Sequence, residues 1–209
     1  MRPTVKICGI TRPEDAELAL ELGADFVGVI LYGPSPRSVA FDKARELLAV
    51  IPEGRRVAVD VSPGSLELER YREAGFDRFQ IHCPLETGLG ELAVWSGLVG
   101  EDRLWMAPKV SPGESFPQRI FEFCDTALVD AFRKDKYGGT GETADWQRFV
   151  DWATLYNHKQ FILAGGLGPK NIREALEATG ATFVDANSAL EARPGEKDHA
   201  LMRAFFEAL

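Results

Sequence analysis

The chain has 209 residues, of which 45% are hydrophobic and 27% are charged, the balance of an ordinary globular protein rather than a disordered or fibrous one. Its formal net charge of −8 argues against nucleic acid or an anionic membrane as the main partner. No apolar run approaches the ~20 residues of a membrane span, and no signal-peptide pattern opens the sequence.

Short apolar runs alternate with amphipathic stretches along the whole chain. The predicted strands are Val5–Cys8, Phe26–Leu31, Arg56–Val61, Arg78–His82, Leu104–Ala107, Ala127–Asp130, Gln160–Ala164 and Phe183–Ala186. The predicted helices are Pro13–Leu22, Asp42–Val50, Ser65–Ala74, Leu89–Leu98, Pro117–Phe123, Trp146–Tyr156, Lys170–Ala178 and Asp198–Ala208. Strand and helix in alternation imply parallel strands joined by right-handed crossovers.

Eight such units predict an α/β fold, a closed (β/α)8 TIM barrel formed as a single domain by residues 1–209. Three similar segments, "LELGADFVGVI", "YREAGFDRFQIH" and "ALEATGATFVDAN", support a repeat of about 26 residues, because each has a helix end, a glycine and then a strand. The alternative is an open doubly wound sheet, but no G-x-G-x-x-G follows the first strand.

Polar or glycine residues stand at or just beyond the carboxyl ends of most of the predicted strands, where a barrel of this kind has its active site. They are Cys8, Arg37 in the second loop, Asp60, His82, Asp130, Gly165–Gly166 and Asp185–Asn187. A purely structural chain does not need polar groups at nearly every such position. We therefore expect the site at this end of the barrel.

Two loops have the composition of a phosphate site. "AGGLGPKNI" follows the seventh strand and "DANSAL" the eighth, and glycine backbone with a helix N-terminus is suited to binding an anion. The alternative is that Gly165 and Gly166 only form a tight turn. The long loop "AFRKDKYGGTGETADW" is either a lid over a ligand or a plain surface loop.

The three cysteines, Cys8, Cys83 and Cys124, form no C-x-x-C pair, so we expect neither a disulfide framework nor a zinc site, and a reducing cytoplasm fits best. Cys8 is either inert packing in a buried strand or a reactive thiol at a strand end. In the same way, Asp130 either caps a loop or serves chemistry, and Arg37 is either a solvated charge or a ligand for an anion.

Several segments together resemble one enzyme family. They are "KICGIT" at the first strand, "PRSV" around Arg37, "LVD" at the sixth strand, then "YGGTGETADW", "LAGGLGPKNI" and "PGEKDH". In this order they are similar to phosphoribosylanthranilate isomerase of tryptophan biosynthesis. The resemblance covers essentially the whole chain and implies an Amadori rearrangement of an aminoaldose to an aminoketose, without cofactor or metal.

The resemblance also implies roles for individual residues. Cys8 is expected as the general base and Asp130 as the general acid, with Arg37 at the anthranilate end of the substrate. The remaining residues expected to bind substrate, chiefly its phosphate, are His82, Gly139, Gly141, Gly165, Gly166, Asp185, Asn187 and Ser188. The expected partner is a phosphorylated small molecule, and the expected state is a cytoplasmic monomer or homodimer.

Some positions depart from the family pattern. Asp60 and Met106 stand where an apolar and a basic residue are common, which predicts a more negative mouth and a weaker hold on an anionic substrate. Ala189 replaces a glycine near the expected phosphate. Two alternatives remain at this stage: a sister isomerase of histidine biosynthesis, which has an aspartate where this chain has Cys8, and a non-catalytic phosphate-binding barrel.

Overall fold

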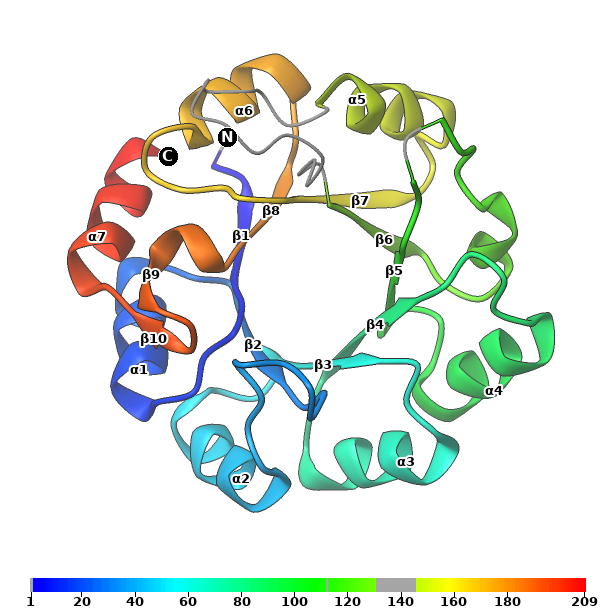
Figure 1. Ribbon diagram of the computed structural model, residues 1–209, viewed down its shortest axis with the longest axis horizontal. Coiled ribbons are helices and arrows are strands. Elements are labelled where there is room, and N and C mark those ends of the chain that lie inside the picture. Colours follow the sequence, from blue (N-terminus) through cyan, green and yellow to red (C-terminus); the bar gives the residue numbers. More distant parts are fainter. Residues whose placement is uncertain (1, 112, 131–145) are drawn as a thin grey trace.

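The computed structural model describes residues 2–111, 113–130 and 146–209. Within these residues, eight parallel strands close into a barrel in the order β1 to β8, and β1 pairs with both β2 and β8. Figure 1 looks down this barrel and shows the strands as an inner ring with the helices outside it. The predicted TIM barrel is confirmed.

The strand boundaries agree with the sequence prediction to within one residue at each end. The barrel strands are β1 Thr4–Ile7, β2 Phe26–Ile30, β3 Arg56–Val61, β4 Arg78–Cys83, β5 Leu104–Pro108, β6 Thr126–Asp130, β7 Gln160–Ala164 and β8 Phe183–Ala186. The helices are α1 Pro13–Leu22, α2 Phe41–Val50, α3 Ser65–Ala74, α4 Leu89–Val99, α5 Trp146–Leu155, α6 Ile172–Thr179 and α7 His199–Ala208. Two 3-10 helices, η1 Gln118–Glu122 and η2 Ser188–Leu190, complete the set together with a hairpin of β9 Glu191–Arg193 and β10 Glu196–Lys197.

The segment between β5 and β6 differs from the prediction, because the helix expected at Pro117–Phe123 is the short 3-10 helix η1. Aromatic packing holds this segment in place of a longer helix. The ring of Phe116 lies 5.2 Å from that of Phe121 and 5.5 Å from that of Phe161, measured between centroids. Five residues thus cover a part of the barrel where a full helix was expected.

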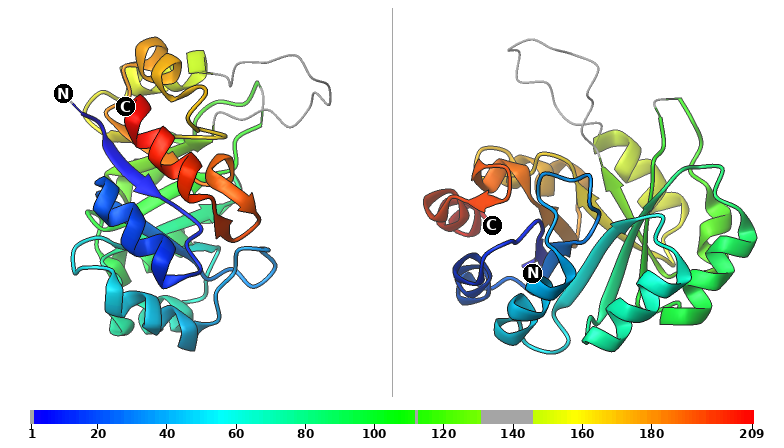
Figure 2. Two further views of the ribbon diagram at one scale, coloured as in Figure 1. Left: turned by 90° about the vertical axis from the view of Figure 1, so that its left-hand side faces the viewer. Right: turned by 60° about the horizontal axis from the view of Figure 1, so that its bottom comes forward.

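The hairpin β9–β10, which the sequence analysis missed, connects η2 to α7. Asp198 caps α7 by accepting hydrogen bonds from the backbone N–H groups of Ala200 and Leu201. The fully buried Asp15 of α1 accepts from Arg12 at 2.7 Å and contacts His199 Nε2 at 2.9 Å. The bond between Asp15 and His199 attaches the segment "PGEKDH" to α1. Figure 2 shows the hairpin at the same end of the barrel as the loop after β2.

Side chains of the barrel strands alternate between the barrel interior and the layer under the helices. On β3, Val57 and Val59 belong to the interior cluster that includes Cys8, whereas Ala58 packs in the outer cluster. Asp60 is two residues after Ala58 and therefore faces the same, outer side of the barrel. There it accepts a 2.6 Å hydrogen bond from the hydroxyl of Tyr71 of α3. Met106 is likewise fully buried in the outer cluster. The expectation that Asp60 and Met106 make the mouth more negative is therefore wrong.

The barrel interior changes character along its length. At the amino-terminal end of the strands, the rings of Phe26, Trp105 and Phe183 pack with centroid distances of 5.0 to 5.7 Å. Inward-facing residues further along the strands become polar, beginning with the fully buried Lys6. The apolar half closes one end of the barrel, and the polar half opens at the carboxyl ends of the strands.

The position of Asp60 leads to a first prediction. Tyr71→Phe removes the hydroxyl that donates to this buried carboxylate and should lower the free energy of unfolding by about 1–3 kcal/mol. The KM for substrate should stay within twofold of the wild-type value. Urea denaturation and steady-state kinetics measure the two effects. Asp60→Asn, which keeps an acceptor for Tyr71, is the matched control, and a severalfold change in its KM would place Asp60 at the mouth after all.

Candidate active site

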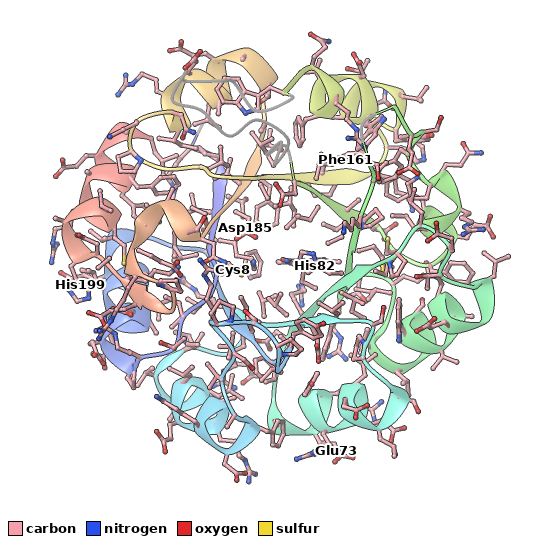
Figure 3. All side chains as sticks on the ribbon, viewed as in Figure 1. Cys8, Glu73, His82, Phe161, Asp185 and His199 are labelled. Carbon is pink, nitrogen blue, oxygen red and sulfur yellow. The ribbon has the colours of Figure 1, made fainter. Side chains whose placement is uncertain are left out.

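The polar end of the barrel brings together several of the residues expected at the site. Cys8 follows β1, His82 lies near the end of β4, and Asp185 lies on β8. In Figure 3 their labelled side chains lie within the ring of strands, whereas Glu73 and His199 lie at the periphery. The strand topology therefore assembles residues that are up to 177 positions apart in the chain.

Cys8 is 3% exposed and belongs to the interior cluster of the barrel. Lys6 is two residues earlier and points to the same side, so its ammonium lies beside the thiol. Gly28 of β2 makes room for both, because a Cβ there would lie 3.0 Å from Cys8 Sγ and 3.1 Å from Lys6 Nζ. Burial raises the pKa of the Cys8 thiol, although Lys6 opposes the rise. Cys8 is thus a neutral thiol at rest with a cation next to it.

Lys6 and Asp185 form a buried ion pair, with 2.9 Å between Lys6 Nζ and Asp185 Oδ2. Burial alone would lower the pKa of Lys6, but Asp185 and Cys8 outweigh it, so the pKa is raised and the side chain is an ammonium ion. The second oxygen, Asp185 Oδ1, is buried and has no hydrogen-bond partner among the described residues. Asp185 was expected to contact substrate, and this structure gives it the additional task of neutralising Lys6.

His82 and Asp130 border a cavity of about 650 Å³ at the β3–β6 side of the mouth. Burial and the charge of Lys6 lower the pKa of His82 to about 4, so the imidazole is neutral at pH 7. Its Nε2 lies 2.9 Å from Gln80 Nε2. In the neutral ring this nitrogen can accept a hydrogen bond from the Gln80 amide N–H. Asp130 ends β6 and is exposed. The cavity is also lined by apolar side chains from β3, β5 and β6, including Val61, Ala107 and Leu128.

A second charged group lies on the β1, β2 and β8 side of the mouth. Arg37 contacts Glu191 through both Nε and Nη2, at 2.8 and 2.7 Å. Lys197, fully buried at its side chain, contacts Glu191 at 3.2 Å and donates to Asn187 Oδ1 at 2.9 Å. Lys197 also lowers the pKa of Cys8, after the larger effects of burial, Lys6 and Asp185.

Sequence reasoning missed Glu191 and Lys197 because neither stands at the carboxyl end of a predicted barrel strand; they lie on the hairpin β9–β10, which was not predicted. The only signal was the segment "PGEKDH", which contains Lys197 and was used for the family resemblance alone.

The loops after β7 and β8 have the backbone expected of a close turn. Gly165 and Gly166 adopt left-handed φ angles of 102° and 64°, which only glycine takes without strain. Asn171 fixes this loop, because its side chain accepts from the Gly168 N–H at 2.9 Å and donates to the Gly166 carbonyl at 3.1 Å. Ser188 is exposed at the start of η2.

Ala189 faces the loop after β7. A Cβ at Gly168 would lie 2.8 Å from the Ala189 methyl group, so the two loops pack with one methyl between them. The extra methyl at position 189 therefore fills space over Gly168.

The remaining expected residues, Gly139 and Gly141, lie outside the described residues. Within the part of the chain that the structure describes, no three His, Cys, Asp or Glu side chains are placed to hold a metal ion. In the same part, no helix is long and apolar enough to cross a membrane.

Comparison with known proteins identifies the family. The family model described as N-(5'phosphoribosyl)anthranilate (PRA) isomerase matches residues 5–208. The chain belongs to this family. It is 37% identical to N-(5'-phosphoribosyl)anthranilate isomerase of Rubrobacter xylanophilus over 212 residues, which cover 98% of this chain and 97% of the relative.

Solved structures agree with this assignment. A crystal structure of phosphoribosyl anthranilate isomerase in complex with reduced 1-(o-carboxyphenylamino)-1-deoxyribulose 5-phosphate is 28% identical, with a TM-score of 0.77 and coverage of 99% of this chain and 97% of that one. Mutually generated monomers of the dimeric Thermotoga maritima enzyme are also 28% identical, with a TM-score of 0.78 and coverage of 100% and 98%.

The chain is therefore a phosphoribosylanthranilate isomerase of tryptophan biosynthesis, as the resemblance implied. This assignment takes precedence over the sister isomerase of histidine biosynthesis. Cys8, the residue on which the sequence analysis separated the two enzymes, directly follows β1.

The contact between Gly168 and Ala189 gives a second prediction. Gly168→Ala should force the two loops apart, at a cost of about 1–3 kcal/mol in stability, and should raise the KM for the phosphorylated substrate. Adding Ala189→Gly removes the clash and should restore most of both losses. Gly97→Ala, where nothing lies within 4 Å of the added methyl, is the control in the same thermal-denaturation and kinetic assays. No recovery in the double variant would show that the contact does not control the loops.

Proposed function

We propose that Cys8 is the general base and Asp130 the general acid of the isomerisation. The observation that supports this proposal best is the Cys8 thiol in the barrel interior beside the ammonium of Lys6. A thiol becomes a base only as its thiolate, and a neighbouring cation favours that form. Asp130 ends β6, and its charge adds to burial, the larger cause, in raising the pKa of Asp185.

The two residues would act in succession. Protonated Asp130 donates to the furanose ring oxygen, the bond from that oxygen to C1′ breaks, and a Schiff base forms between C1′ and nitrogen. The Cys8 thiolate then takes the proton from C2′, and the electron pair of that C–H bond forms the C1′–C2′ double bond of an enolamine. The enolamine tautomerises to the ketone. A general acid or base positioned in this way typically contributes a factor of about 10²–10⁴ to the rate.

The cavity between β3 and β6 is the proposed site of the anthranilate ring. Its volume of about 650 Å³ and the apolar part of its lining, which includes Val61, Ala107 and Leu128, suit an aromatic group. The phosphate is proposed to bind at Gly165–Gly166 and Asn187–Ser188, where left-handed glycines and the N-terminus of α6 present backbone N–H groups. The ribose would then lie across the mouth between Cys8 and Asp130.

Local charge makes the mouth attractive to this anionic substrate despite the net charge of −8. Lys6, Arg37 and Lys197 surround Cys8, and the carboxylates that face them are Asp185 and Glu191. The cations thus exceed the carboxylates in this group by one.

We also propose that the protein works in the cytoplasm, for which three free, buried cysteines are suited. We further propose that it is a monomer or homodimer, since the Thermotoga maritima relative is dimeric.

The acid–base assignment gives a third prediction. Cys8→Ser and Asp130→Asn should each lower kcat by about 10²-fold or more, while both proteins still bind the reduced product analogue. Turnover is followed as the loss of anthranilate-type fluorescence from freshly generated substrate. Cys124→Ser, a change of a fully buried cysteine outside the barrel interior, is the control and should leave kcat unchanged. Near-normal turnover in Cys8→Ser would refute the base assignment.

A fourth prediction concerns the carboxylate of the anthranilate. Arg37 is expected to bind it, although two of its nitrogens already contact Glu191. Arg37→Met should raise KM about tenfold or more through the loss of a charge-assisted hydrogen bond. Lys109→Met is the matched test, because Lys109 lines the cavity on the opposite side of the mouth. A larger KM effect at Lys109 than at Arg37 would transfer the carboxylate site to β5.

A further inference from the structure

Lys6 has no part in the acid–base pair, yet it is among the largest fully buried side chains of the described structure. Its ammonium lies inside a barrel whose lower half is filled with aromatic rings. Burying an ammonium ion is unfavourable unless it is paired, and a buried ion pair is often no more stable than apolar packing of the same volume. Stability alone therefore gives no reason for a lysine at this position.

The surroundings of Lys6 point to Cys8. The side chains of Lys6 and Cys8 both pack over Gly28, whose missing Cβ would lie within about 3 Å of Lys6 Cε, Lys6 Nζ and Cys8 Sγ. Any larger residue at position 28 would push these atoms aside. The neighbouring strand is thus shaped to hold the ammonium against the thiol.

We propose that Lys6 is the positioning residue of the general base and serves as the counter-ion of the Cys8 thiolate. This inference rests on the proposed role of Cys8. When the thiol ionises, its proton passes to water at the mouth of the barrel, and the negative charge remains on Sγ beside Lys6 Nζ. When the thiolate later takes the C2′ proton, the sulfur becomes neutral again and Lys6 keeps Asp185 as its partner.

Other charged groups also face Cys8, and their effects can be separated. Asp185 is the ion-pair partner of Lys6, and its negative charge opposes ionisation of the Cys8 thiol, while the positive charge of Lys197 favours ionisation. Lys197 and Arg37 are both paired with Glu191, His82 is neutral, and Asp130 lies across the mouth at the end of β6. Lys6 and Asp185 should therefore shift the Cys8 pKa in opposite directions, which a merely structural role for the pair would not produce.

The test measures the pKa of Cys8 directly, through the pH dependence of its alkylation by iodoacetamide. Lys6→Met should raise this pKa by about one unit or more, which lowers the alkylation rate at neutral pH about tenfold per unit. Asp185→Asn should lower the pKa. The kcat/KM profile of Lys6→Met should shift to higher pH by the same amount. Reaction at Cys83 and Cys124 is subtracted with the Cys8→Ser protein.

A matched control comes from the opposite end of the barrel. Lys159 donates to Asp125 at 2.7 Å and to two backbone carbonyls, so Lys159→Met also removes a paired lysine. It should leave the pKa of Cys8 unchanged. An unchanged Cys8 pKa in folded Lys6→Met, or the same shift in Lys159→Met, would overturn the proposal.

A second comparison remains decisive if Lys6→Met fails to fold with Asp185 left unpaired. The Lys6→Met/Asp185→Asn protein and the Asp185→Asn protein differ only at position 6. The Cys8 pKa should be higher in the double variant, and equal values would overturn the proposal. Failure of the proposed function is seen separately, because it would appear as turnover in Cys8→Ser while these pKa differences persist.

Discussion

The ion pair between Lys6 and Asp185 joins the first and last strands of the barrel. The two residues are register partners on β1 and β8, so the pair forms only when the ring closes. The same pair places an ammonium beside Cys8, at the point where the interior changes from aromatic to polar. The electrostatics of the proposed base therefore depend on closure of the barrel, which pairs β1 with β8. An unfolded chain, or one in which the barrel is open, has neither this ion pair nor an ammonium ion held beside Cys8.

A second set of contacts links the carboxyl-terminal part of the chain to the same region. Asp15 of α1 holds the backbone N–H of Lys197 at 3.3 Å and the ring of His199, while the Lys197 side chain reaches Glu191 and Asn187. The Thr11 hydroxyl donates to the carbonyl of Gly195. The last segment of the sequence thus packs onto the first, and this packing orients Arg37 and the loop after β8.

Much of the fold could be read from the sequence because strands, turns and glycines give local signals. Strand boundaries and the identity of Cys8, His82 and Asp130 as strand-end residues follow from those signals. The errors at Asp60 and Met106 arose from treating every residue near a strand end as part of the mouth, although alternate residues face the helices. The partners of Lys6, Arg37 and Lys197 could not be read, because they depend on side chains brought together only by closure.

The distribution of charge explains how an acidic protein can bind an acidic substrate. The net charge is −8, yet Lys6, Arg37 and Lys197 are grouped at one end of the barrel with their side chains wholly or largely buried. Charges in a region of low dielectric act strongly over short distances and weakly on the distant surface. In the proposed binding mode, the cations near Cys8 therefore act on a ligand at the mouth, while the acidic surface favours solubility of the whole chain.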